Sequence, residues 1–306
     1  MNVPYIRAED VEGRLDWGEV ADALAAGHGV ARAEIGDLFL KSAENVLLSR
    51  AAWWPGQGIA VKSVTVMPEN LQAARPTVHG AMVLFDETYG EVRAVIDSAL
   101  VTKWKTAADS LLGARLLARP DAATLTIVGA GSVAASLISA YRSHWPDLAI
   151  TIWNRTRPRA EALADSFGVA VADDLEAAVR AADIVACCTM AQQPILRGEW
   201  LSQGCHVDLI GAFTPEMREA DNVALQRARI FVDSFETTLT HIGELKIPLE
   251  EGTIARADVL GDLHDLCASR VGREASSDIT LYKNGGGAHL DLLTGKVILQ
   301  TYHGGS

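Results

Sequence analysis

The sequence predicts an α/β protein in which a doubly wound parallel sheet is combined with a discontinuous α+β domain. Three observations lead to this prediction. The first third of the chain contains two hairpin patterns, strands alternate with helices from Ala122 onward, and the last helical segment has no obvious partner in the parallel sheet. Alternating strands and helices are typical of parallel sheets, because parallel strands need long crossover connections. With 306 residues, the chain is long enough for two domains.

The first third is predicted to form one helix followed by antiparallel strands. Residues 16–37 show helical spacing of apolar side chains. Residues 46–54 and 59–67 flank the turn sequence PGQG, and residues 80–86 and 91–97 flank ETYG, so each pair indicates a hairpin. A long helix is expected from Ser98 to Ala118, because Pro120 stops it.

The rest of the chain is predicted to form the parallel sheet and a final helix. The expected strands are TLTIVGAG, LAITIWNR, VAVAD, DIVACCTM, HVDLIGAF, RIFVDS and ITLYK. The expected helices include PRAEALADSFG, LEAAVRAA and DVLGDLHDLCAS. The last helix, residues 288–304, is expected to return to the N-terminal part. We therefore expect one domain from residues 1–118 and 287–306 and a second from residues 119–286.

A glycine motif follows the first strand of the parallel sheet. Its residues are Gly129, Ala130, Gly131, Ser132, Val133 and Ala134. Gly129 permits a tight turn, Gly131 lets the backbone approach a pyrophosphate, and Ala134 keeps the helix close to the sheet. The N-terminus of the following helix attracts the anion. The sequence therefore predicts a Rossmann-type dinucleotide site, the alternative being a glycine-rich turn that binds nothing.

The end of the second parallel strand bears on the choice of cofactor. An acidic residue there would bind the ribose 2′-hydroxyl of NAD, but the chain has Asn154, Arg155, Thr156 and Arg157. Guanidinium groups suit a 2′-phosphate, so NADP(H) is favoured, with NAD(H) as the alternative. The two arginines could also simply cap a surface loop.

Composition and charge limit the partners. With 49% apolar and 22% charged residues, the chain has the balance of a globular protein. The net charge of −12 argues against nucleic acid and anionic membranes, which are bound mainly through Lys and Arg clusters. The charged N-terminus and the lack of a membrane-spanning apolar run predict a cytoplasmic protein. The spacing of Cys187, Cys188, Cys205 and Cys267 suggests buried thiols and no metal site.

Lys62 interrupts an apolar strand face. Strand alternation places it beside Ala60, Val64 and Val66, where an unpaired ammonium group would be costly. It therefore needs an anionic partner or a chemical role. Burial would lower its pKa, which suits proton exchange with a substrate nitrogen. The alternative is a lysine at a strand edge whose ammonium group reaches solvent.

Nearly the whole chain resembles the ornithine cyclodeaminase and mu-crystallin family. The resemblance rests on VKSVTV, RPTVHG, LFD with GEVRAVID, KTAADSLLGARLLARPDAATLTIVGAG and ITLYKNGGGAHLDL. It implies a substrate and dimerisation domain completed by the last helix, a Rossmann domain between its parts, a homodimer, and a small-molecule carboxylate substrate. It also implies a catalytic role for Lys62, with Lys41 and Arg50 as further substrate-binding residues.

The chain departs from the family pattern at two positions. Lys105 stands where most relatives have Arg, which keeps the cation but loses the two-point grip on a carboxylate. Phe213 stands where ornithine cyclodeaminases have an Asp thought to handle the amine of ornithine, and a phenyl ring cannot accept a proton. Thr77 and His79 lie in RPTVHG, where relatives often read PTHQG, so both are candidate substrate residues, although a lone His there is more often structural.

These features favour an NAD(P)H-dependent reductase of a small cyclic imino acid, such as a pyrroline-2-carboxylate or a related ketimine, that forms the L-amino acid. An enzyme resembling alanine dehydrogenase is the closest alternative. An ornithine cyclodeaminase is less favoured because of Phe213. A non-catalytic NADPH-dependent binding protein, as mu-crystallin is for an aromatic hormone, is the alternative of another class.

Overall fold

The structure, a computed structural model, describes residues 3–304. The chain divides into two compact units. Unit 1 comprises Met1–Lys105 and Gly287–Ser306, and unit 2 comprises Thr106–Gly286. The sequence placed the first boundary at residues 118 and 119, after the long helix. The units instead divide within this helix, α3 (Ser98–Leu117). Its first turns belong to unit 1 and the remainder belongs to unit 2.

Unit 1 contains a six-stranded sheet in the order β1-β6-β5-β4-β3-β2. Its strands are β1 (Tyr5–Ile6), β2 (Glu34–Ser42), β3 (Asn45–Trp54), β4 (Gly58–Val66), β5 (Val78–Phe85) and β6 (Val92–Asp97). All neighbouring strands are antiparallel except β1 and β6. Both predicted hairpins, β3–β4 and β5–β6, are therefore confirmed.

The predicted helix over residues 16–37 is wrong in its second half. Helix α2 (Trp17–His28) begins at the N-cap Asp16, whose side chain accepts a hydrogen bond from the backbone N–H of Glu19, and it ends at Gly29. Residues 34–42 form β2, which pairs along its whole length with β3. Pairing with a neighbouring strand decides the structure there, and this pairing is not visible in local spacing.

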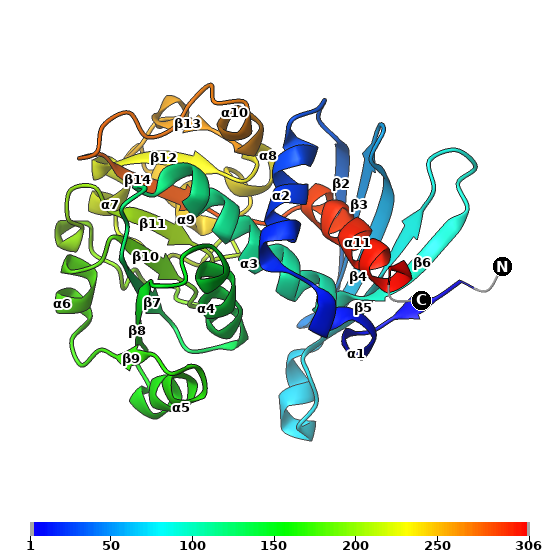
Figure 1. Cartoon of the computed structure of the whole chain (residues 1–306), viewed down its shortest axis with the longest axis horizontal. Helices are drawn as coiled ribbons and strands as arrows, with labels where there is room; N and C mark the ends of the chain where they lie inside the picture. The colour runs from blue at the N-terminus through cyan, green and yellow to red at the C-terminus, as the bar shows by residue number, and fades with distance from the viewer. Residues whose placement is uncertain (1–2, 305–306) are drawn as a thin grey trace. The chain divides into compact units, whose positions relative to one another are not determined.

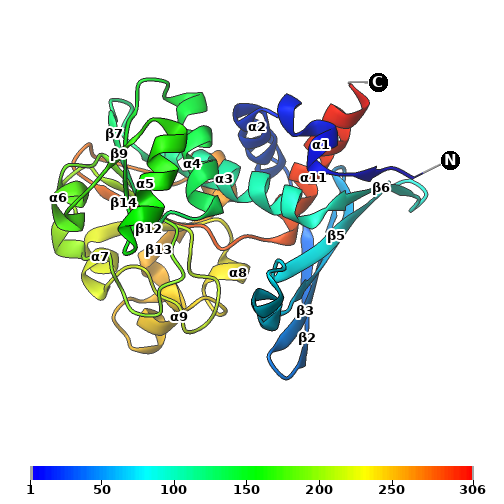
Figure 2. The same cartoon turned by 90° about the horizontal axis from the view of Figure 1, so that it is seen from below.

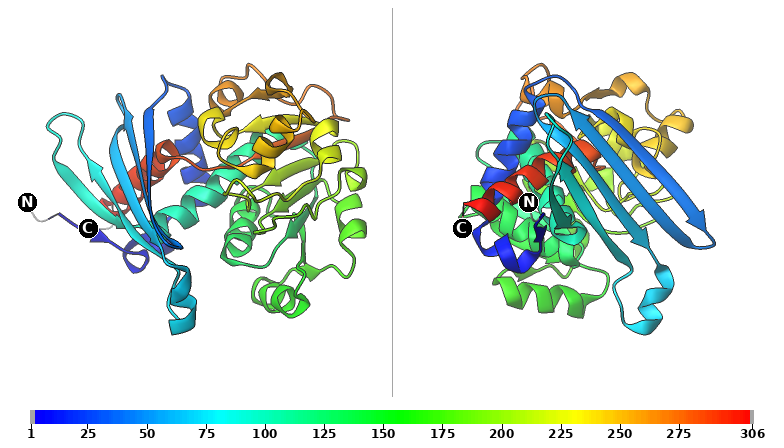
Figure 3. Two further views of the ribbon diagram at one scale, coloured as in Figure 1. Left: turned by 180° about the vertical axis from the view of Figure 1, so that it is seen from behind. Right: turned by 90° about the vertical axis from the view of Figure 1, so that its right-hand side faces the viewer.

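Helices cover one face of the unit 1 sheet. They are α1 (Ala8–Val11), α2 and the C-terminal α11 (Ala288–His303). Figures 2 and 3 show α11 lying between the sheet and α2, and it contacts β3, β4 and β5. The side chains of Trp54, Met82 and Ile96 are fully buried in this layer. The opposite face exposes Leu38, Leu40 and Trp53.

Unit 2 contains an eight-stranded, wholly parallel sheet in the order β13-β12-β14-β11-β10-β7-β8-β9 (Figure 1). Its strands are β7 (Thr124–Val128), β8 (Ala149–Trp153), β9 (Ala170–Val171), β10 (Ile184–Cys187), β11 (His206–Leu209), β12 (Ala228–Val232), β13 (Val259–Gly261) and β14 (Ile279–Lys283). The predicted doubly wound sheet is confirmed. The order of strands reverses at β7, which lies between β8 and β10.

Seven helices of the described chain connect these strands. They are α4 (Ser132–His144), α5 (Arg157–Phe167), α6 (Leu175–Arg180), α7 (Asn222–Arg227), α8 (Phe235–Thr238), α9 (Gly243–Glu250) and α10 (Leu263–Cys267). The helix predicted over residues 258–269 is wrong in its first part. Residues 259–261 form β13, and Asp262 then caps α10 by accepting hydrogen bonds from the N–H groups of His264 and Asp265.

The four cysteines form no disulfide. Cys187 and Cys205 are buried as predicted, whereas Cys188 and Cys267 are only half-buried. Burial raises the pKa of each thiol, to about 12 for Cys205 and about 11 for Cys267. Within residues 3–304, no cluster of three or more His, Cys, Asp or Glu side chains could hold a metal ion. None of the helices there is long and apolar enough to cross a bilayer.

Candidate active site

The glycine motif lies between the end of β7 and the start of α4. Gly129 has φ +124°, a conformation that other residues rarely adopt, and an added Cβ would lie 2.9 Å from Cys188 Sγ. Gly131 has no atom within 4 Å of its Cβ position and makes no side-chain cap on α4. The backbone therefore leaves open space in front of the first N–H groups of a 13-residue helix, which fits a pyrophosphate.

The neighbouring motif residues support this arrangement. Ala134 is fully buried, so the helix can pack closely on the sheet. Ala130 and Val133 are half-buried, and Ser132 is exposed at the first position of α4. Gly131 and Ser132, the exposed residues of the motif, thus lie at the N-terminus of the helix.

The loop after β8 contains the residues predicted to contact the adenosine ribose. Asn154 is half-buried and donates from Nδ2 to the carbonyl oxygen of Thr156 at 2.9 Å. Arg157 forms ion pairs with Glu161, at 2.7 Å, and with Asp173. Arg155 is exposed. Because Arg157 is already engaged by two carboxylates, Arg155 is the stronger candidate for contact with a 2′-phosphate.

Lys62 is buried in unit 1 and paired with a carboxylate. It lies on β4 with 6% exposure, and its Nζ donates to Asp291 Oδ1 at 2.6 Å and to Thr102 Oγ1 at 3.5 Å. Asp291 lies on α11 and is 1% exposed. The anionic partner that the sequence required for Lys62 is therefore present. The structure does not support the alternative of a lysine whose ammonium group reaches solvent.

Two further cations surround this pair. Arg50 on β3 lies directly opposite Lys62 in the strand register and donates to Asp37 Oδ2 on β2 at 2.6 Å. Lys105 on α3 is 7% exposed. The buried groups Lys62, Lys105 and Asp291 carry one net positive charge, whereas Arg50 is half-buried and pairs with the exposed Asp37. A buried charge excess is costly unless an anion balances it, so the cluster fits a substrate carboxylate.

The electrostatics of the pair favour proton exchange at Lys62. Burial lowers the pKa of Lys62 and Asp291 opposes this change, while Lys105 and Arg50 lower the pKa further. Burial raises the pKa of Asp291, but Lys62, Lys105 and Arg50 outweigh burial, and the pKa of Asp291 lies below its usual value. Asp291 is therefore ionised, and Lys62 gives up a proton more readily than an exposed lysine.

The other predicted residues of unit 1 do not join this cluster. Lys41 is exposed on β2, four residues beyond Asp37 along the strand. His79 is exposed, and its register opposite Thr65 places it on the sheet face that Lys62 does not share. Thr77 is half-buried just before β5, where its carbonyl oxygen accepts from the N–H of Met67 at 2.7 Å. We therefore do not retain His79 as a proton shuttle.

Sequence reasoning missed Asp291 as a site residue. Its signal was an acidic residue in a strongly apolar helical segment, where it needs a partner just as Lys62 does. The segment instead served to place the last helix and to support the family resemblance. Pairing two such residues requires the fold, because Lys62 and Asp291 are 229 residues apart.

Two loops of unit 2 carry exposed apolar side chains at the carboxyl ends of adjacent strands. Met190 follows β10 and is 74% exposed, and Phe213 follows β11 and is 60% exposed. Both loops lie beside the strand-order reversal at β7, where ligands bind in open α/β sheets. Phe213, the predicted departure from ornithine cyclodeaminases, is thus available to an apolar ligand.

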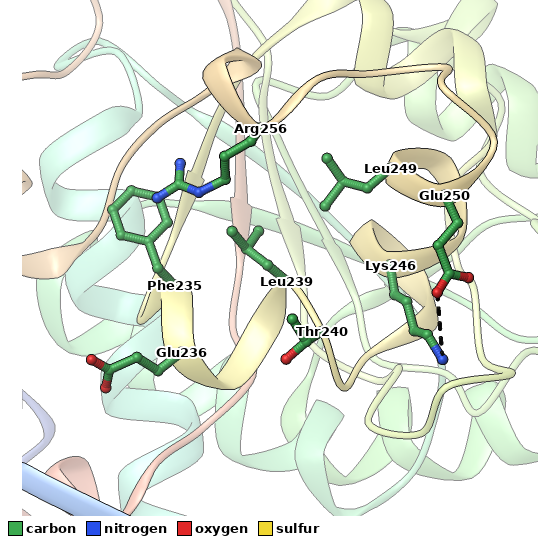
Figure 4. Close-up of a pocket in the computed structure, with 8 residues that line it drawn as sticks. All are labelled: Phe235, Glu236, Leu239, Thr240, Lys246, Leu249, Glu250 and Arg256. Carbon is green, nitrogen blue, oxygen red and sulfur yellow. Dashed lines mark ion pairs between the residues drawn. The ribbon is translucent and has the colours of Figure 1, made fainter.

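A separate pocket of unit 2 lies between α8 and α9 (Figure 4). The Arg256 guanidinium stacks over the Phe235 ring at 3.8 Å, and Lys246 pairs with Glu250 at 3.8 Å. Arg256, Lys246 and Glu250 of this pocket therefore already have partners. It contains none of the residues that the sequence predicted for cofactor or substrate, and we do not assign it to the active site.

Comparisons with known proteins show the family of the chain. The model of the ornithine cyclodeaminase/mu-crystallin family matches residues 54–306. The chain is 48% identical to a Delta(1)-pyrroline-2-carboxylate reductase of Paracoccus denitrificans, over 98% of this chain and 97% of the relative.

Two solved structures share the fold. The Delta(1)-pyrroline-2-carboxylate reductase of Thermococcus litoralis, in complex with NADH and L-proline, matches with a TM-score of 0.89 at 23% identity, over 99% of this chain and 98% of the other. An archaeal alanine dehydrogenase dimer with bound NAD matches with a TM-score of 0.92 at 24% identity, over 100% and 97%. Both the predicted fold class and the predicted resemblance are confirmed: the chain belongs to the ornithine cyclodeaminase/mu-crystallin family.

Proposed function

We propose that the chain is an NAD(P)H-dependent oxidoreductase that reduces a small cyclic imino acid of the pyrroline-2-carboxylate type to the L-amino acid. The observation that carries this proposal is the buried Lys62–Asp291 pair among Arg50 and Lys105, which combines a proton donor with a site for one carboxylate. The 48% identity to a reductase of this substrate class supports it.

Arg50 and Lys105 bind the substrate carboxylate in this mechanism. Arg50 is held in place by Asp37, so its guanidinium group is oriented before substrate arrives. Lys105 contributes a point charge from α3 and not a planar fork. The carboxylate balances the excess positive charge of the cluster, which makes binding of an anionic substrate more favourable than binding of a neutral one.

Lys62 supplies the proton that completes the reduction. Its Nζ donates a proton to the imine nitrogen, and the C=N bond becomes a CH–NH bond. When bound, the reduced nicotinamide supplies the hydride to the imine carbon. Asp291 orients Lys62 and stabilises its ammonium form, and Lys62 regains a proton from water after the reaction.

The residues of unit 2 fit a dinucleotide, and we propose NADP(H) as the preferred form. The support is the absence of a carboxylate in the 154–157 loop together with the exposed Arg155. The solved relatives with NADH or NAD make NAD(H) the alternative.

The proposed assembly is a homodimer formed through unit 1. The uncovered face of its sheet presents Leu38, Leu40 and Trp53, each more than half exposed. An apolar sheet face of this kind is typical of an interface. The solved alanine dehydrogenase is a dimer.

A panel of substrates tests the proposed function. NADPH or NADH oxidation would be followed by the loss of absorbance of the reduced nicotinamide, with pyrroline-2-carboxylate, piperideine-2-carboxylate, pyruvate with ammonia or methylamine, and buffer alone. Ornithine would be tested separately for release of ammonia. We expect the highest kcat/KM with a cyclic imino acid and a higher kcat/KM with NADPH than with NADH.

The other outcomes each contradict the proposal in a defined way. Preference for pyruvate with ammonia would indicate an alanine dehydrogenase, and ammonia release from ornithine would indicate a cyclodeaminase. Binding of NADPH without turnover of any compound would favour a ligand-binding protein like mu-crystallin. Preference for NADH would overturn only the proposed choice of cofactor.

A further inference from the structure

Glu219 is a buried carboxylate that the proposed chemistry does not use. It is fully buried, lies between the loops after β10 and β11, and accepts four hydrogen bonds from these loops. Its Oε1 accepts from the backbone N–H and the hydroxyl of Thr189, at 2.7 and 2.9 Å. Its Oε2 accepts from the N–H groups of Gly211 and Ala212, at 2.6 and 3.2 Å. Each oxygen thus holds a different loop.

The two loops that Glu219 joins are packed backbone against backbone. A Cβ on Gly211 would lie 1.8 Å from the carbonyl oxygen of Thr189, so only glycine allows this approach. Thr189 immediately precedes Met190, and Gly211 lies two residues before Phe213. The position of both exposed apolar side chains therefore depends on the loops that Glu219 holds together.

Glu219 is itself fixed by a second buried carboxylate. Glu244 on α9 accepts from the N–H of Glu219 at 2.7 Å and from the N–H of Ala220 at 3.0 Å. Burial raises the pKa of Glu219, and Lys283 and the hydrogen bonds from Thr189 oppose that rise. Four N–H and O–H donors around two oxygens are the arrangement that an ionised carboxylate satisfies.

The place of these loops in the sheet identifies the part of the cofactor that they face. The glycine motif after β7 fits the pyrophosphate, and the loop after β8, on one side of β7, faces the adenosine ribose. The remaining half of a dinucleotide extends to the other side of β7, where β10 and β11 end. That half carries the nicotinamide.

We infer that Glu219 is a positioning residue: it joins the loops after β10 and β11 into one surface, with Met190 and Phe213, against which the nicotinamide half of the cofactor lies. This inference rests on the proposed function only in that unit 2 binds a dinucleotide. It does not depend on which substrate is reduced.

The test compares ligands with and without the nicotinamide. Dissociation constants would be measured by calorimetry for NADPH and 2′-phospho-ADP-ribose, and for NADH and ADP-ribose. Glu219→Gln offers one oxygen where two are needed, so we expect about tenfold weaker binding of NADPH and NADH, with binding of the ADP-ribose ligands changed less than about twofold.

Variants of Thr189 keep the test decisive if Glu219→Gln does not fold. Thr189→Val removes only the hydroxyl donor, and we expect about threefold to fivefold weaker binding of NADPH and NADH. Thr189→Ser retains the hydroxyl and is expected to bind like the wild type. Thr126→Val is the matched control, because Thr126 is a buried threonine of β7 whose hydroxyl donates to the carbonyl oxygen of Ala178.

Equal weakening for ligands with and without nicotinamide would overturn the inference and leave Glu219 a merely structural residue. Unchanged NADPH and NADH binding in Thr189→Val would also overturn it. If the variants show the expected changes in binding but the wild type reduces no imino acid, the result would contradict the proposed function and support the inference.

Discussion

Lys62 and Asp291 depend on each other for both burial and charge. Neither group would remain charged in an apolar layer without a partner, because an isolated buried charge shifts its pKa toward the neutral form. The 2.6 Å contact between them stabilises the charged form of each, and Arg50 and Lys105, with Asp37 paired to Arg50, leave the cluster one positive charge in excess. The same residues therefore explain why the lysine is tolerated and why an anion would bind beside it.

Replacing Asp291 by Asn should shift the pH profile of reduction. Asp291 opposes the lowering of the Lys62 pKa by burial, so its loss lowers that pKa further. Because Lys62 must be protonated to donate to the imine, the alkaline limb of kcat/KM should move to lower pH. Steady-state rates across the pH range would measure this shift. An unchanged alkaline limb would mean that Lys62 is not the titrating acid.

Asp208 on β11 makes the free energy of unfolding depend on pH, and this effect is separate from the proposed reduction. Burial raises its pKa to about 7, against about 3.9 in an unfolded chain. Between these values only the unfolded state loses its proton, so this carboxyl group lowers the free energy of unfolding as the pH rises from about 4 to about 7.

Asp208→Asn removes that titration. The free energy of unfolding of the variant relative to wild type should increase between about pH 4 and pH 7, by up to about 1.4 kcal/mol per pH unit. Urea denaturation at several pH values would measure it. A difference between the two proteins that does not vary with pH would contradict the raised pKa of Asp208.

At the scale of elements, the turn from β7 to α4 links backbone geometry to cofactor binding. The structure requires glycine at positions 129 and 131 for different reasons. Gly129 requires a positive φ, whereas Gly131 has φ −99° and is needed only for the open space beside it. Their substitutions should therefore have different consequences.

Gly131→Ala should weaken NADPH binding by about tenfold or more without lowering the melting temperature, because its Cβ contacts no protein atom but occupies the space for the pyrophosphate. Gly129→Ala should both weaken binding and destabilise the protein by about 1–3 kcal/mol, from the strained φ. Thermal melts and calorimetric titrations of both variants would check this. Equal losses of stability in Gly129→Ala and Gly131→Ala would contradict the different reasons given for the two glycines.

The sequence predicted the elements with strong local signals and missed those that depend on distant partners. The glycine motif, the two hairpins and the long helix before Pro120 were all visible in local patterns. Strand β2 was missed because its pairing with β3 outweighs the helical spacing of residues 16–37. Strand β13 is three residues long and precedes a capped helix, so local spacing merged both into one helix.

The site was predictable to a similar extent. Lys62 stood out because strand alternation alone places a charge on an apolar face. Asp291 and Glu219 did not, because Lys62 and Thr189 are distant from them in sequence and an acidic residue within a helix or loop is usually exposed. Alternation alone could not have excluded His79 from the face of Lys62, because the 17 positions from Lys62 to His79 span a loop whose length sets the register only once the fold is known.

At the scale of the molecule, each unit has one task in the proposed enzyme. Unit 2 provides the parallel sheet and the loops for a dinucleotide, and unit 1 provides the charged cluster for the substrate. The C-terminal helix α11 belongs to unit 1 although it follows unit 2 in sequence, and it brings Asp291 to Lys62. The uncovered apolar face of the unit 1 sheet is the proposed dimer interface.

Leu40→Asp should dissociate the proposed homodimer, because it places a charge on that apolar face, where Leu40 is 53% exposed. Light scattering coupled to size-exclusion chromatography would give the mass in solution. Leu71→Asp is the control, since Leu71 is more exposed but lies in the 3-10 turn Pro68–Ala73, away from the sheet face. A monomeric wild type, or a dimeric Leu40→Asp variant, would contradict this interface.

The most direct test of the central claim is the rate of imino acid reduction by Lys62→Met, measured at saturating NADPH with pyrroline-2-carboxylate. Loss of the buried proton donor should lower kcat by about 10²–10⁴-fold while NADPH binding stays unchanged. Lys103→Met, an exposed lysine on α3 paired with Glu12, should retain kcat within about twofold. A Lys62→Met variant with the wild-type kcat would contradict the account.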